Sequence, residues 1–210
     1  CVLPAVLLRS LKKLNPDIGE EYILETVKEL RKDFTATDIV DTNYNLYNRI
    51  RNGIQITVRK NGKENFVLLK LIDFDEPNNN SFTAVSQMWI QGKVYFRRPD
   101  ILIFVNGLPL VFIELKNSIV KVEEAYNKNL NDYIKDTPNL FAFNQLCVLS
   151  NGLETRTGAY NATYNFFFEW LKIESEKENP NRKALSEPET FGESSARYFV
   201  DGLLDKKRLI

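Results

Sequence analysis

The 210-residue sequence contains no histidine, only two cysteines and a single methionine, Met88. Without histidine, the chain cannot build a Ser-His-Asp or Cys-His triad, nor a zinc site with histidine ligands. Because Cys1 and Cys147 lack the spacing of a metal site, the default expectation is a reduced, cytoplasmic compartment. Any chemistry must therefore be carried out by carboxylates, lysines and hydroxyls.

Net charge is also lacking, because 28 basic residues balance 28 acidic residues. A protein that holds nucleic acid by bulk electrostatics is usually basic, so contact with DNA would need a local patch or another source of affinity. No apolar run approaches the roughly 20 residues of a membrane helix, and we expect no membrane partner. With 43% hydrophobic and 27% charged residues, the composition is that of a globular protein with a sizeable core.

Hydrophobic periodicity predicts a mixed α/β fold, in which helices cover a central mixed sheet. The reason is the order of elements, which runs from a helix through antiparallel strands to a second helix and a further strand. The predicted elements are a helix at 16–34 that Asp17 can cap, a hairpin over 54–74 with its turn at Asn61-Gly62, a strand at 82–90, two strands around Asn106-Gly107, a helix at about 123–135 and a buried strand at 145–150.

Two later segments have weaker patterns. Residues 154–171 predict a short strand followed by aromatic side chains that either stack on bases or, as we favour, pack under the sheet. The last 40 residues are polar and predicted to be helical, with interruptions at Pro180 and Pro188. The aromatic residues are Tyr164, Phe166, Phe167, Phe168 and Trp170.

The most informative stretch is RRPDILIFVNGLPLVFIELKN, which runs from Arg97 to Asn117. Its two strands are nearly continuous apolar runs, which predicts burial on both faces. An acid without a partner in such a strand would cost several kcal/mol. We therefore expect Asp100 and Glu114 to lie where the sheet opens to water, or around a cation.

The register of this hairpin decides whether the two acids can meet. A plain two-residue turn at Asn106-Gly107 would set Asp100 opposite Ile113 and point Glu114 to the other face. A three-residue loop with Gly107 in the left-handed conformation would instead place Asp100, Glu114 and Lys116 on one face. We predict this bulged loop.

Two converging carboxylates are hard oxygen ligands that suit Mg²⁺ or Mn²⁺. Lys116, on the same face, could orient or deprotonate a water there and offset developing negative charge. A Glu-x-Lys pair is also common as a solvated pair at a strand edge in a chain this rich in charge. Both interpretations stay open on the residues alone.

Pro99-Asp100, followed after thirteen residues by Glu114-Leu115-Lys116, resembles the PD-(D/E)xK nuclease motif. The segments IFVNGLPLV, EAYN and NQLCVLSNG are similar to the nuclease domain of the motor (R) subunit of type I restriction enzymes, over roughly Ile54 to Trp170. The resemblance implies a restriction-endonuclease-like fold and an endonuclease that cuts duplex DNA with Mg²⁺. It further implies that Asp100, Glu114 and a carbonyl near Leu115 bind the metal ion and that Lys116 positions the attacking water.

This family also carries a Q-x-x-x-Y motif on the helix after the nuclease hairpin, which Asn129 and Tyr133 match with asparagine in place of glutamine. Lys128 is the alternative to Asn129, and packing is the alternative role for Tyr133. The larger nuclease family often adds an acid from its first helix, although a solvated helix surface explains the available ones better and the family's own acid could precede Cys1. The remaining candidates are Glu20, Glu21 and Glu25 for that acid, and Arg97 and Arg98 for phosphate contacts.

The resemblance implies a nuclease core at residues 1–170 and a helical extension at 171–210 that leads toward a motor domain. Because no G-x-x-x-x-G-K-S/T motif is present, ATP would act only in the motor domains of a longer bacterial or archaeal protein, of which we expect this chain to be a piece. The implied partners are duplex DNA and, through the full-length protein, methyltransferase and specificity subunits. Two alternatives stay open: a docking module that senses DNA without cutting it, and a PD-(D/E)xK nuclease of repair or phage type.

Overall fold

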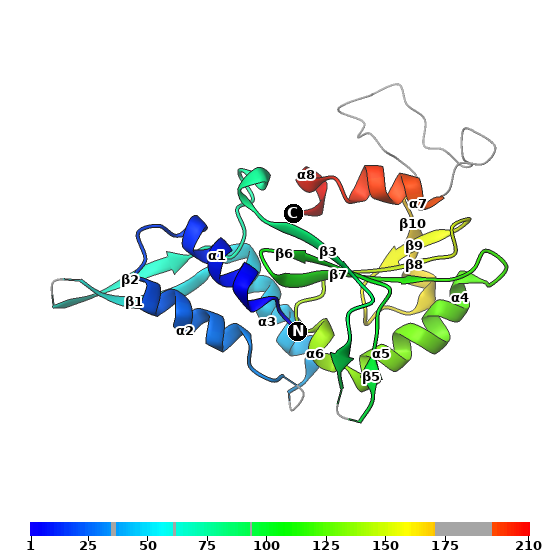
Figure 1. The fold of residues 1–210 in the computed structure, drawn as a ribbon, viewed down its shortest axis with the longest axis horizontal. Helices are drawn as coiled ribbons and strands as arrows, with labels where there is room; N and C mark the ends of the chain where they lie inside the picture. The colour runs from blue at the N-terminus through cyan, green and yellow to red at the C-terminus, as the bar shows by residue number, and fades with distance from the viewer. Residues whose placement is uncertain (35–36, 61, 93, 171–194) are drawn as a thin grey trace, which may run out of the picture.

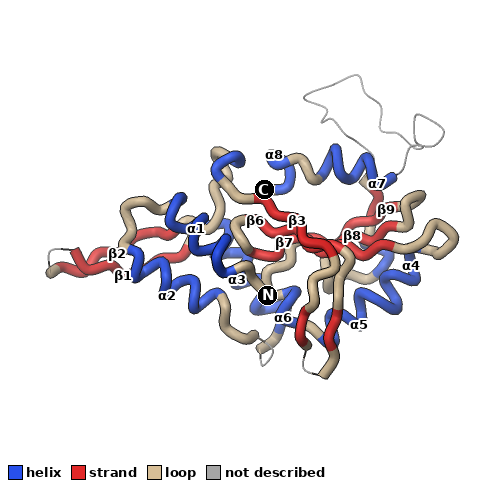
Figure 2. The backbone as a smooth tube through the Cα atoms, viewed as in Figure 1, coloured by secondary structure: helices blue, strands red, loops and turns tan. Residues whose placement is uncertain are grey.

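The computed structural model of the chain describes residues 1–34, 37–60, 62–92, 94–170 and 195–210. A six-stranded sheet forms its centre, and helices lie on both faces of that sheet (Figures 1 and 2). The predicted mixed α/β fold, with a restriction-endonuclease-like central mixed sheet flanked by helices, is confirmed. Among the described residues, no helix has the length and apolar composition needed to cross a membrane.

The central sheet has the strand order β10-β9-β8-β7-β6-β3. Among the described strands of this sheet, only β7 and β8 pair in parallel, and the other neighbours are antiparallel. A parallel pair needs a crossover connection, which explains why helices separate these two strands in the chain. The strands are β3 (Phe82–Ser86), β6 (Ile101–Val105), β7 (Leu108–Leu115), β8 (Leu146–Ser150), β9 (Thr155–Gly158) and β10 (Phe168–Glu169).

One face of the sheet packs against N-terminal and C-terminal helices. Leu7, Ile23 and Phe199 from these helices share one core with Ile103 and Val111 of the sheet. The helices are α1 (Pro4–Leu14), α2 (Glu20–Leu30), α3 (Ile39–Asn52), α7 (Ser195–Tyr198), the π-helical η4 (Phe199–Leu203) and α8 (Lys206–Leu209). The sequence pattern predicted α2 but not α1 or α3, and its proposed cap is wrong, because Gly19 and not Asp17 occupies the N-cap position.

The opposite face packs against the helix predicted at 123–135. That helix is confirmed and runs through α4 (Val122–Glu124), a π-helical segment η2 (Ala125–Leu130) and α5 (Asn131–Asp136), before α6 (Pro138–Phe141). Leu130 and Tyr133 from this helix pack on Leu102, Phe104 and Phe112 of the sheet. Asp100 and Glu114 lie on this face, because strand residues two apart point the same way.

Two small antiparallel hairpins lie beside the central sheet. The predicted hairpin is confirmed as β1 (Ile54–Lys60) and β2 (Lys63–Leu69). The second pairs β4 (Ile90–Gln91) with β5 (Phe96–Arg97), directly before the strand that begins at Ile101. Short 3₁₀ helices complete the fold at η1 (Pro77–Asn79) and η3 (Tyr164–Phe166).

The aromatic segment packs only in part as predicted. Phe167 is fully buried and stacks with Tyr164 at 6.4 Å between ring centroids, whereas Phe166 and Phe168 are each 62% exposed. The prediction that the whole cluster packs is therefore wrong for Phe166 and Phe168. Their side chains cannot turn inward because they flank the residue that fills the core position.

The C-terminal extension is described only from residue 195, where helical structure is confirmed up to Leu209. The expected interruptions at Pro180 and Pro188 lie outside the described residues. The division between a core at 1–170 and an extension at 171–210 therefore stays a prediction.

Candidate functional site

The hairpin of β6 and β7 contains a bulge, but not where the sequence predicted it. The turn has two residues, with Asn106 at φ 51° and Gly107 at φ 85°, which suits the tight hairpin turn that Asn-Gly favours. The register shifts inside the strands, where Ile103 pairs with Val111 and Phe104 with Pro109. Leu110 is therefore the extra residue of β7. The predicted three-residue loop is wrong, because the turn closes tightly and the strand takes up the shift.

The bulge brings the acidic residues onto one face of the sheet. Beyond it, Ile101 pairs with Ile113, and the same register places Asp100 directly opposite Glu114. Lys116 follows two residues later and points to the same face. The shared face predicted from the sequence is therefore confirmed, with a different origin.

The carboxylate of Asp100 is held by two hydrogen bonds. The main-chain N–H of Leu115 donates to Oδ2 at 2.7 Å, and Nε2 of Gln87 donates to Oδ1 at 2.7 Å. The main-chain N–H of Gln87 also donates to the carbonyl of Asp100 at 3.0 Å. Gln87 thus binds both the carboxylate and the main-chain carbonyl of Asp100 and orients the carboxylate toward β7.

Gln87 is a residue that sequence reasoning missed. Its φ of 53° lies in the left-handed region, where a glutamine is strained. Residues with strained backbones cluster at functional sites. No pattern could have revealed it, because both the conformation and the hydrogen bonds arise only when β3 pairs with β6.

Glu114 is buried and incompletely paired. Its side chain is only 5% exposed, and Nζ of Lys116 donates to its Oε1 at 2.9 Å. Oε2 is buried and has no hydrogen-bond partner among the described residues. Burial raises the pKa of the Glu114 carboxyl, Lys116 opposes that shift, and the charge of Asp100 adds to it. An orphaned carboxylate oxygen of this kind costs roughly 1–3 kcal/mol or more, which a cation would offset.

The main-chain carbonyl of Leu115 completes a set of oxygen donors. The N–H and C=O of one strand residue point to the same neighbouring strand, and this N–H points at Asp100. The carbonyl of Leu115 therefore faces the same side. Mg²⁺ is commonly held by one or two carboxylates and keeps several waters, so this donor set fits it. Within the described ranges, no group of three or more His, Cys, Asp or Glu residues is arranged to hold a metal ion.

Tyr133 lies beside the acids, as the sequence predicted. Its ring meets the ring of Phe112 edge-on, with 5.1 Å between centroids. Burial raises the pKa of Tyr133, and the charges of Glu114 and Asp100 add to the shift. The phenol therefore stays protonated and can act as a hydrogen-bond donor. Packing and proximity to the acids are both observed, so neither interpretation of Tyr133 is eliminated.

The partner position of the Tyr133 motif is less complete. Asn129 is half-buried in the π-helical segment, and no hydrogen bond joins its side chain to Asp100, Glu114 or Lys116. Lys128 does not take its place, because its exposed Nζ pairs with Glu124 at 2.7 Å.

The acids of the first helices lie away from this site. The main-chain N–H of Leu3, before α1, donates to the carbonyl of Gly107, so α1 covers the turn end of the hairpin. Helix α2 packs beside α1 at that end (Figure 1), and Glu20 pairs with Lys12 at 2.6 Å. The structure therefore does not bring Glu20, or Glu21 and Glu25 of the same helix, to Asp100.

The two candidate phosphate-binding arginines have different surroundings. Arg97 pairs with Asp136 and, at 3.4 Å, with Asp132 of α5. Arg98 places its guanidinium carbon 5.1 Å from the centre of the Trp89 ring.

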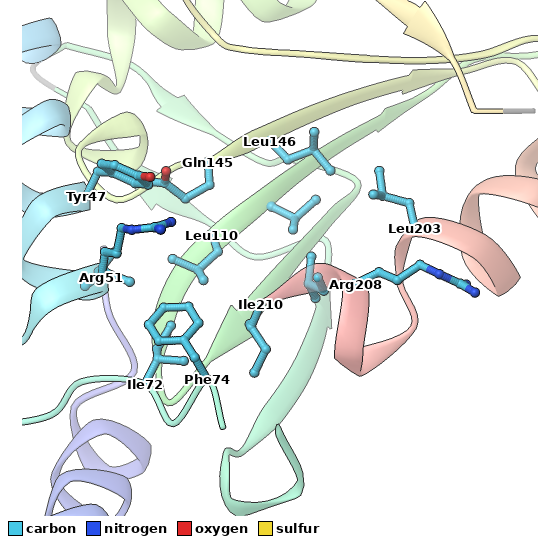
Figure 3. Close-up of a pocket in the computed structure, with 13 residues that line it drawn as sticks. Tyr47, Arg51, Ile72, Phe74, Leu110, Gln145, Leu146, Leu203, Arg208 and Ile210 are labelled. Carbon is cyan, nitrogen blue, oxygen red and sulfur yellow. The ribbon is translucent and has the colours of Figure 1, made fainter. Parts of the chain in front are cut away.

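A separate apolar cavity of about 260 Å³ lies on the other face of the sheet (Figure 3). Tyr47 and Arg51 of α3, Leu110 and Leu146 of the sheet, and Ile210 are among the residues that line it. Apolar pockets are the default candidates for ligand sites, yet neither of the paired acids lines this one. The chemistry therefore points to the rim where β7 ends.

Comparisons with known proteins agree on one family. A family model described as Type I restriction enzyme R protein N terminus matches residues 2–166. The type I restriction enzyme HindI endonuclease subunit of Haemophilus influenzae is 34% identical over 208 residues, covering 97% of this chain and 19% of that protein. The SsaAORF53P endonuclease subunit of Staphylococcus saprophyticus is 34% identical over 136 residues, covering 63% of this chain and 14% of that protein. The chain thus spans about a fifth or less of these relatives' length.

Proposed function

The chain belongs to the family of type I restriction enzyme R protein N termini, and from that premise we propose that it is the Mg²⁺-dependent endonuclease domain of an R subunit, hydrolysing phosphodiester bonds of duplex DNA. The observation that carries the proposal is the pairing of Asp100 with Glu114 on one face, where Glu114 Oε2 is buried without a partner among the described residues. Lys116 contacts the same glutamate. Family membership favours this restriction setting over a repair or phage-type nuclease.

The carboxylates of Asp100 and Glu114 and the carbonyl of Leu115 would hold the ion. Mg²⁺ bound there would supply the charge that lowers the pKa of a water and stabilises a phosphoryl oxygen. Gln87 and the N–H of Leu115 keep the Asp100 carboxylate in place before any ion arrives. Preorganised ligands of this kind avoid the cost of ordering during binding.

Lys116 would hold the attacking water and offset negative charge as it develops on the phosphate. Its Nζ lies 2.9 Å from Oε1 of Glu114, and the Lys116 side chain is only 23% exposed. Tyr133 would donate its phenolic proton in a hydrogen bond to a phosphate or carboxylate oxygen, because its raised pKa keeps it protonated. Asn129, half-buried one helical turn before Tyr133, would contribute a further polar contact.

The metal site can be tested by calorimetry with Mn²⁺ on the 210-residue chain. We expect saturable binding that Asp100→Ala removes, because one of two carboxylates is lost. Asp41→Ala is the matched control, since Asp41 is an exposed aspartate in the first turn of α3. Equal affinity in the wild type and Asp100→Ala would show that the ion, if bound at all, lies elsewhere.

A second candidate function is a docking module that senses DNA without cutting it. The zero net charge favours it, because a neutral domain binds DNA weakly on its own. In that case Mn²⁺ titration should show no specific site. In either case we propose that the partners of the full-length subunit are duplex DNA and the methyltransferase and specificity subunits, and that its motor domains use ATP.

A further inference from the structure

The hairpin of β4 and β5 has one face that packs and one face that does not. Ile90 pairs with Arg97 and Gln91 with Phe96, so this register places Trp89 opposite Arg98. Successive strand residues point to opposite faces, which puts Ile90 and Arg97 on one side. The other side carries Trp89, Gln91, Phe96 and Arg98, and we call these four residues the arm face.

The packed side anchors the hairpin to helix α5. Ile90 is only 7% exposed and belongs to the core below the sheet. Arg97 pairs with Asp132 and Asp136. A Cβ atom on Gly92 would lie 2.2 Å from the carbonyl oxygen of Asp136, so the two backbones touch there. The arm face is therefore presented on a fixed support.

The arm face presents large aromatic rings to solvent in an ordered arrangement. Trp89 is 64% exposed and Phe96 60% exposed, and their rings meet edge-on at 6.5 Å. The guanidinium of Arg98 lies 5.1 Å above the Trp89 ring. Among the described residues, the ion pairs of this hairpin involve Arg97 and not Arg98. Arg98 is thus oriented by a ring while its charge stays available.

The arm face begins next to the paired acids. Arg98 and Asp100 are two residues apart, so their Cα atoms lie at most about 7 Å from each other. The neighbouring Arg97 places its guanidinium carbon 6.0 Å from the centre of the Tyr133 ring, and Tyr133 lies in the field of Asp100 and Glu114. A phosphodiester held at the acids would therefore bring the neighbouring nucleotides to the arm face.

We propose that the arm face binds the DNA next to the scissile phosphodiester, with Arg98 on a phosphate and the rings of Trp89 and Phe96 against deoxyribose. This proposal rests on the proposed nuclease function. It also answers a problem of charge, since the two site acids repel phosphate and the chain has no net positive charge to compensate. A local arginine held by an aromatic ring supplies that attraction.

A protein partner fits the arm face less well. Aromatic side chains bury roughly 150–250 Å² each, so two rings and one arginine fall short of the roughly 800 Å² per partner of a stable protein interface. A nucleic acid already held at the metal site needs only this small additional contact.

The test is fluorescence anisotropy with a duplex of about 20 base pairs, at low salt and with Ca²⁺ in place of Mg²⁺, on the 210-residue chain. We expect Trp89→Ala and Arg98→Ala each to weaken binding by about tenfold, and Arg98→Ala to lower the salt slope by about one. Arg98→Lys should recover the slope but not the full affinity, because lysine keeps the charge and loses the planar stacking. Phe66→Ala is the matched control, as Phe66 is 71% exposed on the β1–β2 hairpin.

Several results would overturn the proposal. These are no DNA binding by the wild type, or unchanged affinity and salt slope in the double variant Trp89→Ala, Arg98→Ala. Unchanged DNA binding combined with weaker assembly with other subunits would make the arm face a protein interface instead. Mn²⁺ calorimetry separates this failure from failure of the nuclease proposal, because both arm variants should keep the Mn²⁺ affinity of the wild type.

Discussion

At the turn end of the β6–β7 hairpin, the buried side chain of Asn106 has partners on both of its polar atoms. Its Nδ2 donates to the Leu71 carbonyl at 2.8 Å and to Asn80 Oδ1 at 2.7 Å, and its Oδ1 accepts the N–H of Ser81 at 2.8 Å. At the open end of the same hairpin, Glu114 is similarly buried, yet its Oε2 has no partner among the described residues. The two side chains are therefore buried to a similar degree, but only that of Asn106 has hydrogen-bond partners for all of its polar atoms.

The two ends of the hairpin also differ in how closely the rest of the chain covers them. A Cβ atom on Gly107 would lie 2.7 Å from the Leu3 carbonyl, so α1 closes directly over the turn. At the open end, Leu115 is 44% exposed, and Gln87, which has a strained backbone, hydrogen-bonds to Asp100. A fold can place satisfied polar groups wherever it needs structure, whereas strain and an orphaned charge are kept where function requires them. The comparison therefore indicates a structural role for Asn106 and a role in the chemistry of the site for Glu114.

The largest expected effect is that of Lys116→Ala, at the open end, on DNA cleavage. We expect DNA cleavage by the full-length subunit in its assembly to fall by at least roughly 1000-fold, or about 4 kcal/mol, because the water loses its positioning cation. ATP hydrolysis, measured in the same preparation, should be unchanged. Retained cleavage would contradict the assignment of the catalytic site to the open end of the hairpin.

Asn106→Ala should produce the opposite result at the turn end. We expect the free energy of unfolding to fall by about 2–3 kcal/mol, because the three hydrogen bonds of a buried side chain are lost. Mn²⁺ affinity of the folded protein should not change. Urea unfolding measures the first quantity and calorimetry the second, with Asn161→Ala as a control at an exposed asparagine. A loss of Mn²⁺ affinity in Asn106→Ala would mean that the two ends are coupled.

Gln87→Gly separates positioning from strain. Glycine accepts the left-handed φ without cost but cannot hydrogen-bond to Asp100 Oδ1. We expect Mn²⁺ affinity to fall by about tenfold, as for other residues that orient a metal ligand, while stability falls little or rises. Calorimetry and urea unfolding on the same sample test both. Wild-type affinity in this variant would show that Leu115 alone orients the aspartate.

The comparison also explains what could be predicted from the sequence. The Asn106-Gly107 turn and the apolar strands were readable because turn chemistry and hydrophobicity are local. The bulge at Leu110 was not, since the residues from Leu108 to Ile113 are all buried and a one-residue shift leaves no mark in an apolar run. Helix α3 was missed because only Leu46 and Ile50 of its residues are buried, which leaves a weak helical pattern of apolar residues.

The smallest expected effect concerns how stability depends on pH at the two ends. Burial raises the pKa of Glu114 above its ordinary value of 4.5, so the native state holds this proton more tightly than the unfolded chain. The free energy of unfolding should therefore be highest below pH 4.5 with respect to this group, and should fall as the pH rises from there through the raised pKa. Each unit of that shift is worth about 1.4 kcal/mol.

Glu114→Gln should remove this dependence, because the amide keeps the shape and an acceptor for Lys116 but does not titrate. Urea unfolding in EDTA at about pH 5 and about pH 8 should show a smaller pH-dependent loss of stability in the variant than in the wild type. Added Mn²⁺ should raise the stability of the wild type at the higher pH and leave the variant unchanged, since binding stabilises only a chain that binds. Asn106→Ala should retain the full pH dependence, because a satisfied amide contributes the same free energy at every pH. Equal pH dependence in the wild type and Glu114→Gln would mean that burying the unpaired Oε2 of Glu114 does not destabilise the protein. The assignment of the metal site to the open end would then fail.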